Sequence, residues 1–244
     1  MSRYVTSKWK KTAALRQVSE LDRCIPETVR MRKASLKRML DRYGMVYVKP
    51  EKGMWGQGVM RVERLGSGYR YQLGTKTNDH GTYDSMYAAI LRDTRKRKYL
   101  VQRGINLLKH NGRRFDLRVM AQYSPAGKWE TTGIIGRVAA KHKVVTNVHN
   151  GGELVPAERL LAPHAEQLDA KLKSLAELGV LTGRTMRNAF PGVYKVGLDI
   201  AMDATLKPWI LEVNTMPDPY VFRKLPDKRV FRKVMRYERA YLAR

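Results

Sequence analysis

The sequence has a single cysteine, few acidic residues beside many basic ones, and no long apolar run. Cys24 has no partner with which to form a disulfide inside the chain, which excludes a small secreted scaffold held by disulfides. No stretch approaches the ~20 apolar residues that a membrane-spanning helix needs. The first residues also lack the apolar core of a secretory signal. We therefore expect a cytoplasmic protein with no segment in a membrane.

Charge is the most unbalanced property of the composition. Among the 244 residues, 48 Lys and Arg stand against 22 Asp and Glu, a formal net charge of +26 at pH 7. This excess predicts attraction to phosphates, nucleic acid or acidic peptides without selecting among them. The basic residues are spread over several clusters, each of which could equally be a solvated helix face, and no helix-turn-helix, zinc-finger or RRM signature is present. Nucleic acid is thus a partner that the charge allows and no motif supports.

Hydrophobic periodicity predicts an α+β fold in which strand hairpins mix with helices. The helix at 35–44 is expected to begin with Ser35 as its N-cap and to end at Gly44. Further helices are predicted at 82–96 and 156–181 and in the basic tail, and strands at 45–50, 58–65, 98–105, 113–123, 129–140, 194–203 and 208–214.

Three glycines connect the first two predicted strands. Gly53, Gly56 and Gly58 would let backbone amides approach a phosphate closely. The segment is neither a P-loop nor a dinucleotide-binding turn, because a strand rather than a helix follows it. A protein kinase carries its lysine after the loop, whereas Lys49 comes before it, at the end of a strand from which its ammonium could reach phosphates under the loop. The alternative is an ordinary hairpin turn with a surface lysine.

The last predicted strand carries a carboxylate and a carboxamide in an otherwise apolar segment. Alternate side chains of an extended chain share a face, so Glu212 and Asn214 are expected to point one way and Leu211 and Val213 the other. The strand therefore predicts two hard oxygen ligands on one face.

The preceding strand adds a second carboxylate. A hairpin loop at 204–207 places Asp203 opposite Pro208 and Asp199 opposite Glu212. Two carboxylates at a Cβ separation of ~5 Å repel each other unless a positive group lies between them. Magnesium is the natural candidate, because it takes oxygen ligands and often combines carboxylates with nucleotide phosphates. The alternative is that one acid is protonated or paired with an arginine.

Taken together, these segments resemble the ATP-grasp superfamily, and within it the endospore coat-associated YheC/YheD family. The resemblance rests on MVYVKPEKGMWGQGVMRVE, RRFDLRVM and GLDIAMDATLKPWILEVNTMPD, and it extends from about residue 7 to residue 219. It implies an ATP-grasp fold, in which two α+β lobes clasp ATP. Its implied parts are an N-terminal helical segment (1–44), a lid lobe (45–104), a C-terminal lobe with the metal site (105–220) and a basic tail (221–244). Residues before Lys8 leave no room for the further N-terminal domain of many relatives, so the lobes or a partner would hold the substrate.

The resemblance also implies which residues form the site. The segment SKWKKTAALRQ resembles the family's first ATP-binding lysine, for which Lys8 and Lys11 are both candidates. The segment KYLVQRGI resembles the hinge that stacks on adenine, although Gln102 and Arg103 occupy positions where an acid is common. Implied metal ligands are Asp199, Glu212 and Asn214; implied nucleotide contacts are Lys8 or Lys11, Lys49, Gly53, Gly56, Gly58, Val101, Gln102, Ile105 and Asn147; implied catalytic groups are Lys49, Arg118 and Arg137.

The activity implied by the resemblance is that of an ATP-dependent carboxylate-amine ligase using Mg²⁺. A carboxylate would become an acyl phosphate, and an amine would displace the phosphate to form an amide. The basic surface points to an acidic peptide or an anionic small molecule as substrate. The alternative is a kinase acting on a hydroxyl of an anionic substrate. A non-catalytic protein that binds nucleotide, nucleic acid or the spore coat is the third hypothesis.

Overall fold

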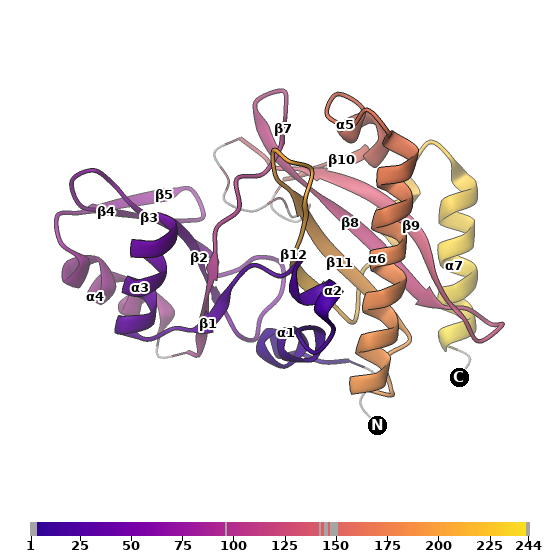
Figure 1. Cartoon of the computed structure of the whole chain (residues 1–244), viewed down its shortest axis with the longest axis horizontal. Coiled ribbons are helices and arrows are strands. Elements are labelled where there is room, and N and C mark those ends of the chain that lie inside the picture. Colours follow the sequence, from indigo (N-terminus) through magenta and orange to yellow (C-terminus); the bar gives the residue numbers. More distant parts are fainter. Residues whose placement is uncertain (1–3, 96, 142, 144–145, 147–150, 243–244) are drawn as a thin grey trace.

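The computed structural model describes residues 4–95, 97–141, 143, 146 and 151–242 as two lobes that lie side by side (Figure 1). Each lobe is built on a six-stranded sheet, and every strand pair in both sheets is antiparallel. The short helices α1 (Lys8–Leu15) and α2 (Ser19–Asp22) lie between the lobes. No helix in the described part of the chain combines the length and the apolar character needed to span a membrane.

The lobe that comprises residues 28–103, which we call the lid lobe, has the strand order β1-β6-β2-β3-β4-β5 and so includes β1 and α3 from the expected N-terminal segment. Its core is formed by alternate strand residues such as Val46 and Val48 and by the apolar face of α3, all fully buried. Gly44 has φ +69° and ends α3, a left-handed conformation in which glycine carries no steric penalty. The elements are β1 (Thr28–Arg30), α3 (Lys33–Tyr43), β2 (Met45–Pro50), β3 (Met60–Arg64), β4 (Tyr69–Leu73), β5 (Lys76–His80), α4 (Tyr83–Thr94) and β6 (Tyr99–Arg103).

The C-terminal lobe has the strand order β10-β9-β8-β11-β12, with β7 paired to β8. Alternate residues of β8 divide its two faces: Leu117 and Val119 pack in the core under α6, whereas Met120 packs under α7. The elements are β7 (Lys109–His110), β8 (Arg113–Tyr123), β9 (Trp129–Val138), β10 (Glu153–Pro156), α5 (Ala157–Leu161), α6 (Leu168–Ala189), β11 (Lys195–Met202), β12 (Pro208–Asn214), η2 (Tyr220–Lys224) and α7 (Lys228–Leu242).

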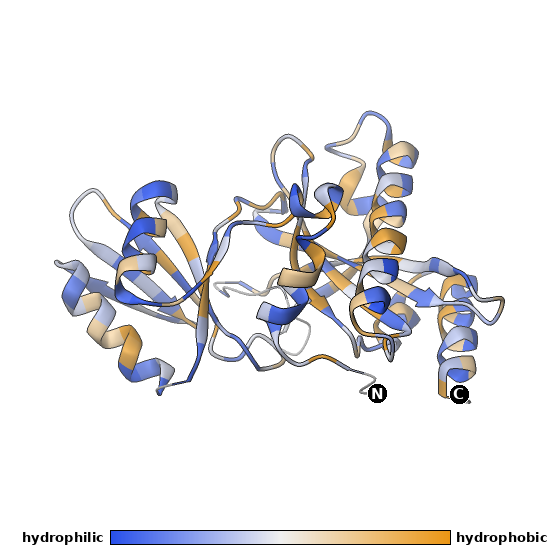
Figure 2. Ribbon diagram, turned by 60° about the horizontal axis from the view of Figure 1, so that its bottom comes forward, coloured by the Kyte–Doolittle hydropathy of each residue, from blue (hydrophilic) through white to orange (hydrophobic). Residues whose placement is uncertain are grey.

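The long helix α6 lies unusually close to its sheet. A Cβ atom added at Gly183 would come within 2.2 Å of the Trp129 ring, and one at Gly179 within 2.9 Å of Val119. Glycine therefore sets the helix-to-sheet distance at these positions. Hydrophobic residues gather on the strands and on the sides of the helices that face them, while outward turns are hydrophilic (Figure 2).

The predicted helix of the basic tail is α7, and it is an integral part of the lobe. Val234 is fully buried against the sheet, and the buried ammonium of Lys195 in β11 pairs with the buried carboxylate of Glu238. The basic residues of α7 therefore lie on a helix that packs against the sheet of the lobe.

The structure corrects two predicted helices. The helix at 35–44 begins two residues earlier, at Lys33, and Ser35 accepts a hydrogen bond from the Arg32 amide (2.9 Å) in place of capping as the first residue. The helix predicted at 156–181 is divided into α5 and α6, because residues 162–167, which include Pro163, leave the helical conformation. The short strands β1, β4, β5, β7 and β10 were not predicted. Each has five residues or fewer, and β1, β5 and β10 lie at the edges of their sheets.

Candidate active site

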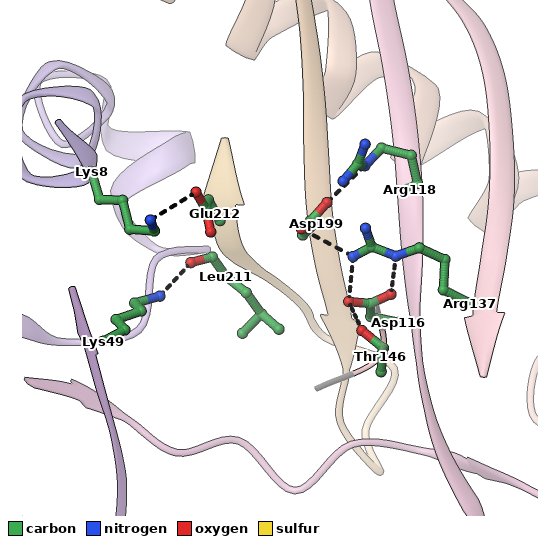
Figure 3. Close-up of polar contacts among 9 residues, drawn as sticks. All are labelled: Lys8, Lys49, Asp116, Arg118, Arg137, Thr146, Asp199, Leu211 and Glu212. Atoms are coloured by element: carbon green, nitrogen blue, oxygen red, sulfur yellow. Dashed lines mark hydrogen bonds and ion pairs between the residues drawn. The ribbon is translucent and has the colours of Figure 1, made fainter. Parts of the chain in front are cut away.

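The candidate site lies where β2 of the lid lobe, α1 and the β11–β12 hairpin of the C-terminal lobe meet (Figure 3). Residues from both lobes line one small cavity there, among them Lys8, Lys11, Lys49 and Glu212. The enclosed space is ≈ 20 Å³, which suits a single water molecule. A nucleotide would enter only after the lobes or these side chains move apart.

Lys49 is the buried cation at the centre of this contact. Its ammonium donates to the Gln102 side-chain oxygen (2.6 Å) and to the backbone oxygen of Leu211 (2.8 Å), which belongs to the other lobe. Burial, reinforced by the neighbouring cations, outweighs the attraction of Glu212 and lowers the pKa of Lys49 to about 8. Lys49 therefore joins the lobes, and it loses its proton at a lower pH than an ordinary lysine does.

Both lysines that the sequence left as alternatives lie in the same cavity. The Lys8 ammonium donates to the Gly53 carbonyl (2.9 Å) and is 3.4 Å from Oε1 of Glu212, so it too contacts both lobes. Lys11 is buried beside it, and this burial lowers its pKa. Three buried ammonium groups thus surround Glu212.

The glycine-rich loop between β2 and β3 needs its glycines. Gly53, Gly56 and Gly58 have φ values of +150°, +72° and +74°. A Cβ added at Gly58 would also lie 2.7 Å from the Tyr99 hydroxyl. Trp55 has φ +59° without being glycine, which is strained for a bulky residue.

The β11–β12 hairpin confirms one predicted pair and corrects the other. Asp199 lies opposite Glu212, as expected, but Pro208 pairs with Met202 and not with Asp203, because the register shifts between Asp199 and Ile200. The shift is a β-bulge that leaves Leu211 without a partner in β11.

The bulge has consequences for both faces of β12. Leu211 packs in a cluster with Trp209 and Ile105, whereas Val213 packs in the core under α6, so the expectation that Leu211 and Val213 share a face is wrong. The Leu211 carbonyl, freed from the ladder, is the group that accepts from Lys49.

Arginines hold Asp199. One carboxylate oxygen accepts a hydrogen bond from Arg118 Nε (2.7 Å), and the other forms an ion pair with Arg137 Nη2 (3.0 Å). Although burial opposes the charged form, these two guanidinium groups lower the pKa of Asp199 to about 2. The arginine pairing that the sequence kept as an alternative to a metal is therefore present. Each oxygen takes one guanidinium contact and keeps a lone pair.

Arg137 is held in turn by a second acid. Its guanidinium makes a two-pronged contact with Asp116 (2.8 and 2.6 Å), and Thr146 donates to the same carboxylate (2.6 Å). Arg137 and Asp116 are almost fully buried, so Arg137 positions Asp199 (Figure 3). Arg118 touches Asp199 through Nε, and no contact of its two terminal nitrogens is seen among the described residues.

The remaining predicted residues lie in different environments. Val101 is in the core of the lid lobe and Ile105 packs on Trp209, so neither side chain lies in the lysine cavity. Gln102 does line it and orients Lys49. Asn214 follows Glu212 on β12, and its side-chain oxygen accepts from the Met216 amide (2.9 Å). Asn147 falls outside the described residues.

The sequence missed Asp116 and Gln102 as the groups that orient Arg137 and Lys49. Asp116 faces Arg137 and Asp199 faces Arg118 as direct cross-strand partners. Pairing the predicted strands 113–123 and 129–140 would have suggested the first contact, but a register shift between Met120 and Ala121 hides it.

Comparisons with known proteins identify the family and the fold of the chain. A family model described as "YheC/D like ATP-grasp" matches residues 1–243. Two proteins of Bacillus subtilis strain 168 are similar: endospore coat-associated protein YheD is 26% identical over 189 residues, 74% of this chain and 41% of YheD. Endospore coat-associated protein YheC is 23% identical over 226 residues, 89% of this chain and 61% of YheC. The chain thus spans less than two thirds of either relative.

Solved structures show the same fold at low sequence identity. D-cycloserine synthetase DcsG superposes with a TM-score of 0.59 at 11% identity, covering 97% of this chain and 70% of DcsG. Carboxyaminoimidazole ribonucleotide synthase from Aspergillus clavatus, solved with ATP, has a TM-score of 0.55 at 12% identity, covering 88% and 45%. These likenesses show that the two lobes form an ATP-grasp fold.

Proposed function

Because the chain belongs to the YheC/D-like ATP-grasp family, we propose that it is an ATP-dependent carboxylate-amine ligase. In this reaction a carboxylate oxygen attacks the γ-phosphorus of ATP, and the bond to ADP breaks, giving an acyl phosphate. An amine then attacks the acyl carbon, loses a proton and displaces inorganic phosphate, leaving an amide. Phosphoryl transfer depends chiefly on positioning and charge neutralisation, so it needs no covalent bond to the protein.

The observation that supports this proposal best is the group of three buried lysines beside a pair of carboxylates. Burying Lys8, Lys11 and Lys49 within one cavity is unfavourable, because Glu212 is a single carboxylate against three ammonium groups in its lining. The phosphates of a nucleotide would supply the further negative charge. Lys49 and Lys8 would hold the phosphates under the Gly53–Gly58 loop, since Lys8 already contacts Gly53.

The oxygens of the hairpin fit magnesium. Asp199 and Glu212 are directly opposed across β11 and β12, and Asn214 follows on the same strand. The residues that the structure describes contain no cluster of three His, Cys, Asp or Glu side chains suited to a metal. Asn214 and the nucleotide phosphates would therefore complete the oxygen ligands that magnesium requires. Bound there, the ion would neutralise charge on the phosphates.

The arginines have different roles in this proposal. Arg137 would hold Asp199 in place for the metal, because its guanidinium contacts Asp116 and Asp199 at the same time. Arg118 would use its terminal nitrogens to orient the carboxylate substrate or the acyl phosphate, which matches the planar fork of a guanidinium. The relatives named for the endospore coat suggest the same location for this protein.

The test is calorimetric titration of ATP with and without magnesium. We expect magnesium to tighten binding in the wild type and to have little effect in Glu212→Gln. Glu153→Gln is the matched control, since Glu153 pairs with Arg113 on the exposed side of the same lobe. Equal binding by the wild type and Glu212→Gln, with and without magnesium, would contradict the metal site. Measuring ADP release separates a ligase from a kinase. A ligase releases ADP only when a carboxylate and an amine are both present, whereas a kinase releases it with a hydroxyl compound.

A further inference from the structure

Most of the exposed large apolar side chains belong to segments that lie beside the candidate site. Among the described residues seven large hydrophobic side chains are exposed. Two of them, Leu91 in α4 and Leu242 in α7, are isolated on outer helices. The other five come from three segments that adjoin the site: Tyr4, Met54, Trp55, Met216 and Tyr220. Scattered single residues need no explanation, whereas a concentration beside a cleft indicates a binding surface.

Hydrogen bonds bring the three segments together beside the lysine cavity, at a place that we call the opening. The Lys8 ammonium contacts Gly53, next to Met54, and also Glu212, at the end of β12. The Val5 amide donates to the Thr215 hydroxyl (2.9 Å), which places Tyr4 beside the segment that follows β12. The lid loop between β2 and β3 therefore faces the segment that runs from Thr215 to Tyr220.

The lid side of this opening is strained. Trp55 adopts φ +59° between Gly53 and Gly56, yet its side chain is 52% exposed. This region of φ costs a bulky residue free energy, and burial of a half-exposed ring offsets only part of that cost. Such outliers collect where a binding site needs them. Met54 next to it is 68% exposed.

The opposite side, the segment from Met216 to Tyr220, is held by hydrogen bonds and by a ring contact. The Met216 amide donates to Asn214, and the Tyr220 amide donates to Asp218 (2.8 Å), so both residues are held by short turns. The Tyr220 ring also lies against Phe231 of α7, with ring centres 6.3 Å apart. The exposed side chains of the lid loop thus lie across from apolar side chains whose segment is held by hydrogen bonds and by packing on α7.

We propose that one of the two substrates carries an apolar group about the size of an aromatic ring, which Met54 and Trp55 cover from the lid against Met216 and Tyr220. This inference rests on the proposed ligase function and specifies its substrate. The substrate is amphipathic: its reacting carboxylate or amine lies inward near Arg118, and its apolar group lies at the opening. The net charge alone would have suggested a wholly polar, anionic substrate.

The experiment compares matched probes by calorimetry at saturating magnesium and a non-hydrolysable ATP analogue. The pairs are 3-phenylpropionate against propionate and 2-phenylethylamine against ethylamine. In one pair we expect the phenyl compound to bind about tenfold tighter or more, as burial of a ring predicts. Trp55→Ala and Tyr220→Ala should each reduce this preference at least about threefold, while Leu91→Ala leaves it unchanged. The melting temperature of each variant is measured alongside; both side chains are more than half exposed, so we expect a folded protein, with a small loss in Tyr220→Ala because its ring contacts Phe231.

The outcomes separate this inference from the function on which it rests. If the nucleotide does not bind, the proposed function fails, and this inference fails with it. If the nucleotide binds but neither phenyl compound is preferred, the ligase proposal stands and the apolar substrate is wrong. If Trp55→Ala weakens the nucleotide and leaves the phenyl preference intact, the loop serves the nucleotide and the inference is overturned.

Discussion

Raising the pH through 8 should weaken ATP binding, because Lys49 will lose its proton. Burial lowers the pKa of Lys49 from its ordinary 10.5 to about 8, with Lys8 and Lys11 acting in the same direction and with Glu212 and Asp199 opposing them. This difference corresponds to about 3 kcal/mol against the charged form. Only the ammonium form attracts phosphate, so the bound nucleotide and the proton are coupled.

The size of the effect follows from the protonated fraction. With a pKa of about 8, roughly nine tenths of Lys49 is charged at pH 7 and roughly one tenth at pH 9, so Kd should rise about tenfold. The terminal phosphate of ATP has lost most of its last proton by pH 7, so the ligand's own charge changes little over this range. The contribution of Lys49 to folding has the opposite trend. Because its pKa is lowered in the folded state, the unfolded chain binds more protons between pH 8 and 10.5, and stability rises across that window.

The assay is calorimetric titration of ATP from pH 7 to 9.5 at constant ionic strength. Lys49→Arg keeps a permanent charge and should give an almost flat profile, and Lys49→Met should bind weakly at every pH. A flat wild-type profile would refute the reasoning. If Lys49→Met kept the tenfold loss, the titrating group would be Lys11, whose pKa burial also lowers.

Three further predictions concern stability. Arg137→Met should lower the free energy of unfolding by about 3–5 kcal/mol, because it leaves the carboxylate of Asp116 buried without its partner, and adding Asp116→Asn should restore part of this in urea unfolding. Gly58→Ala should cost at least about 1 kcal/mol, since its φ is +74° and a Cβ would meet the neighbouring hydroxyl, and an unchanged melting temperature would contradict the loop geometry. Glu238→Ala should lower stability by a similar ~3 kcal/mol by leaving Lys195 buried and unpaired, whereas an exposed tail would tolerate it.

The fold could be predicted where one face of an element is buried and the other is not. The alternation of Val46 and Val48 predicts β2 with the bounds observed, and the apolar spacing of residues 35–44 predicts most of α3. The strands β4 and β5 were not predicted, because their side chains are mostly half-exposed or exposed and the sequence therefore shows little alternation of apolar and polar residues. The break between α5 and α6 lies in a segment whose leucines keep helical spacing on either side.

The site could be predicted only as far as strand pairing is regular. The opposition of Asp199 and Glu212 follows from a short loop and a two-residue period, and it is observed. A bulge adds one residue to one strand, and nothing in the alternation of β12 marks it. That extra residue turns the Leu211 carbonyl toward Lys49, a contact between lobes that depends on tertiary structure.

The charges of the site explain how two acids can lie opposite each other across a hairpin without a metal between them. Arg118 and Arg137 neutralise Asp199, while Lys8 lies against Glu212. Cations nevertheless outnumber anions here by five to three: Lys8, Lys11, Lys49, Arg118 and Arg137 face Asp116, Asp199 and Glu212. Magnesium alone would add to the positive excess, so the cavity disfavours the free ion. The complex of magnesium with ionised ATP carries about two negative charges and would balance the site. Under the proposed function, this arrangement would select the metal together with its nucleotide, and the lysines that join the lobes would hold the phosphates.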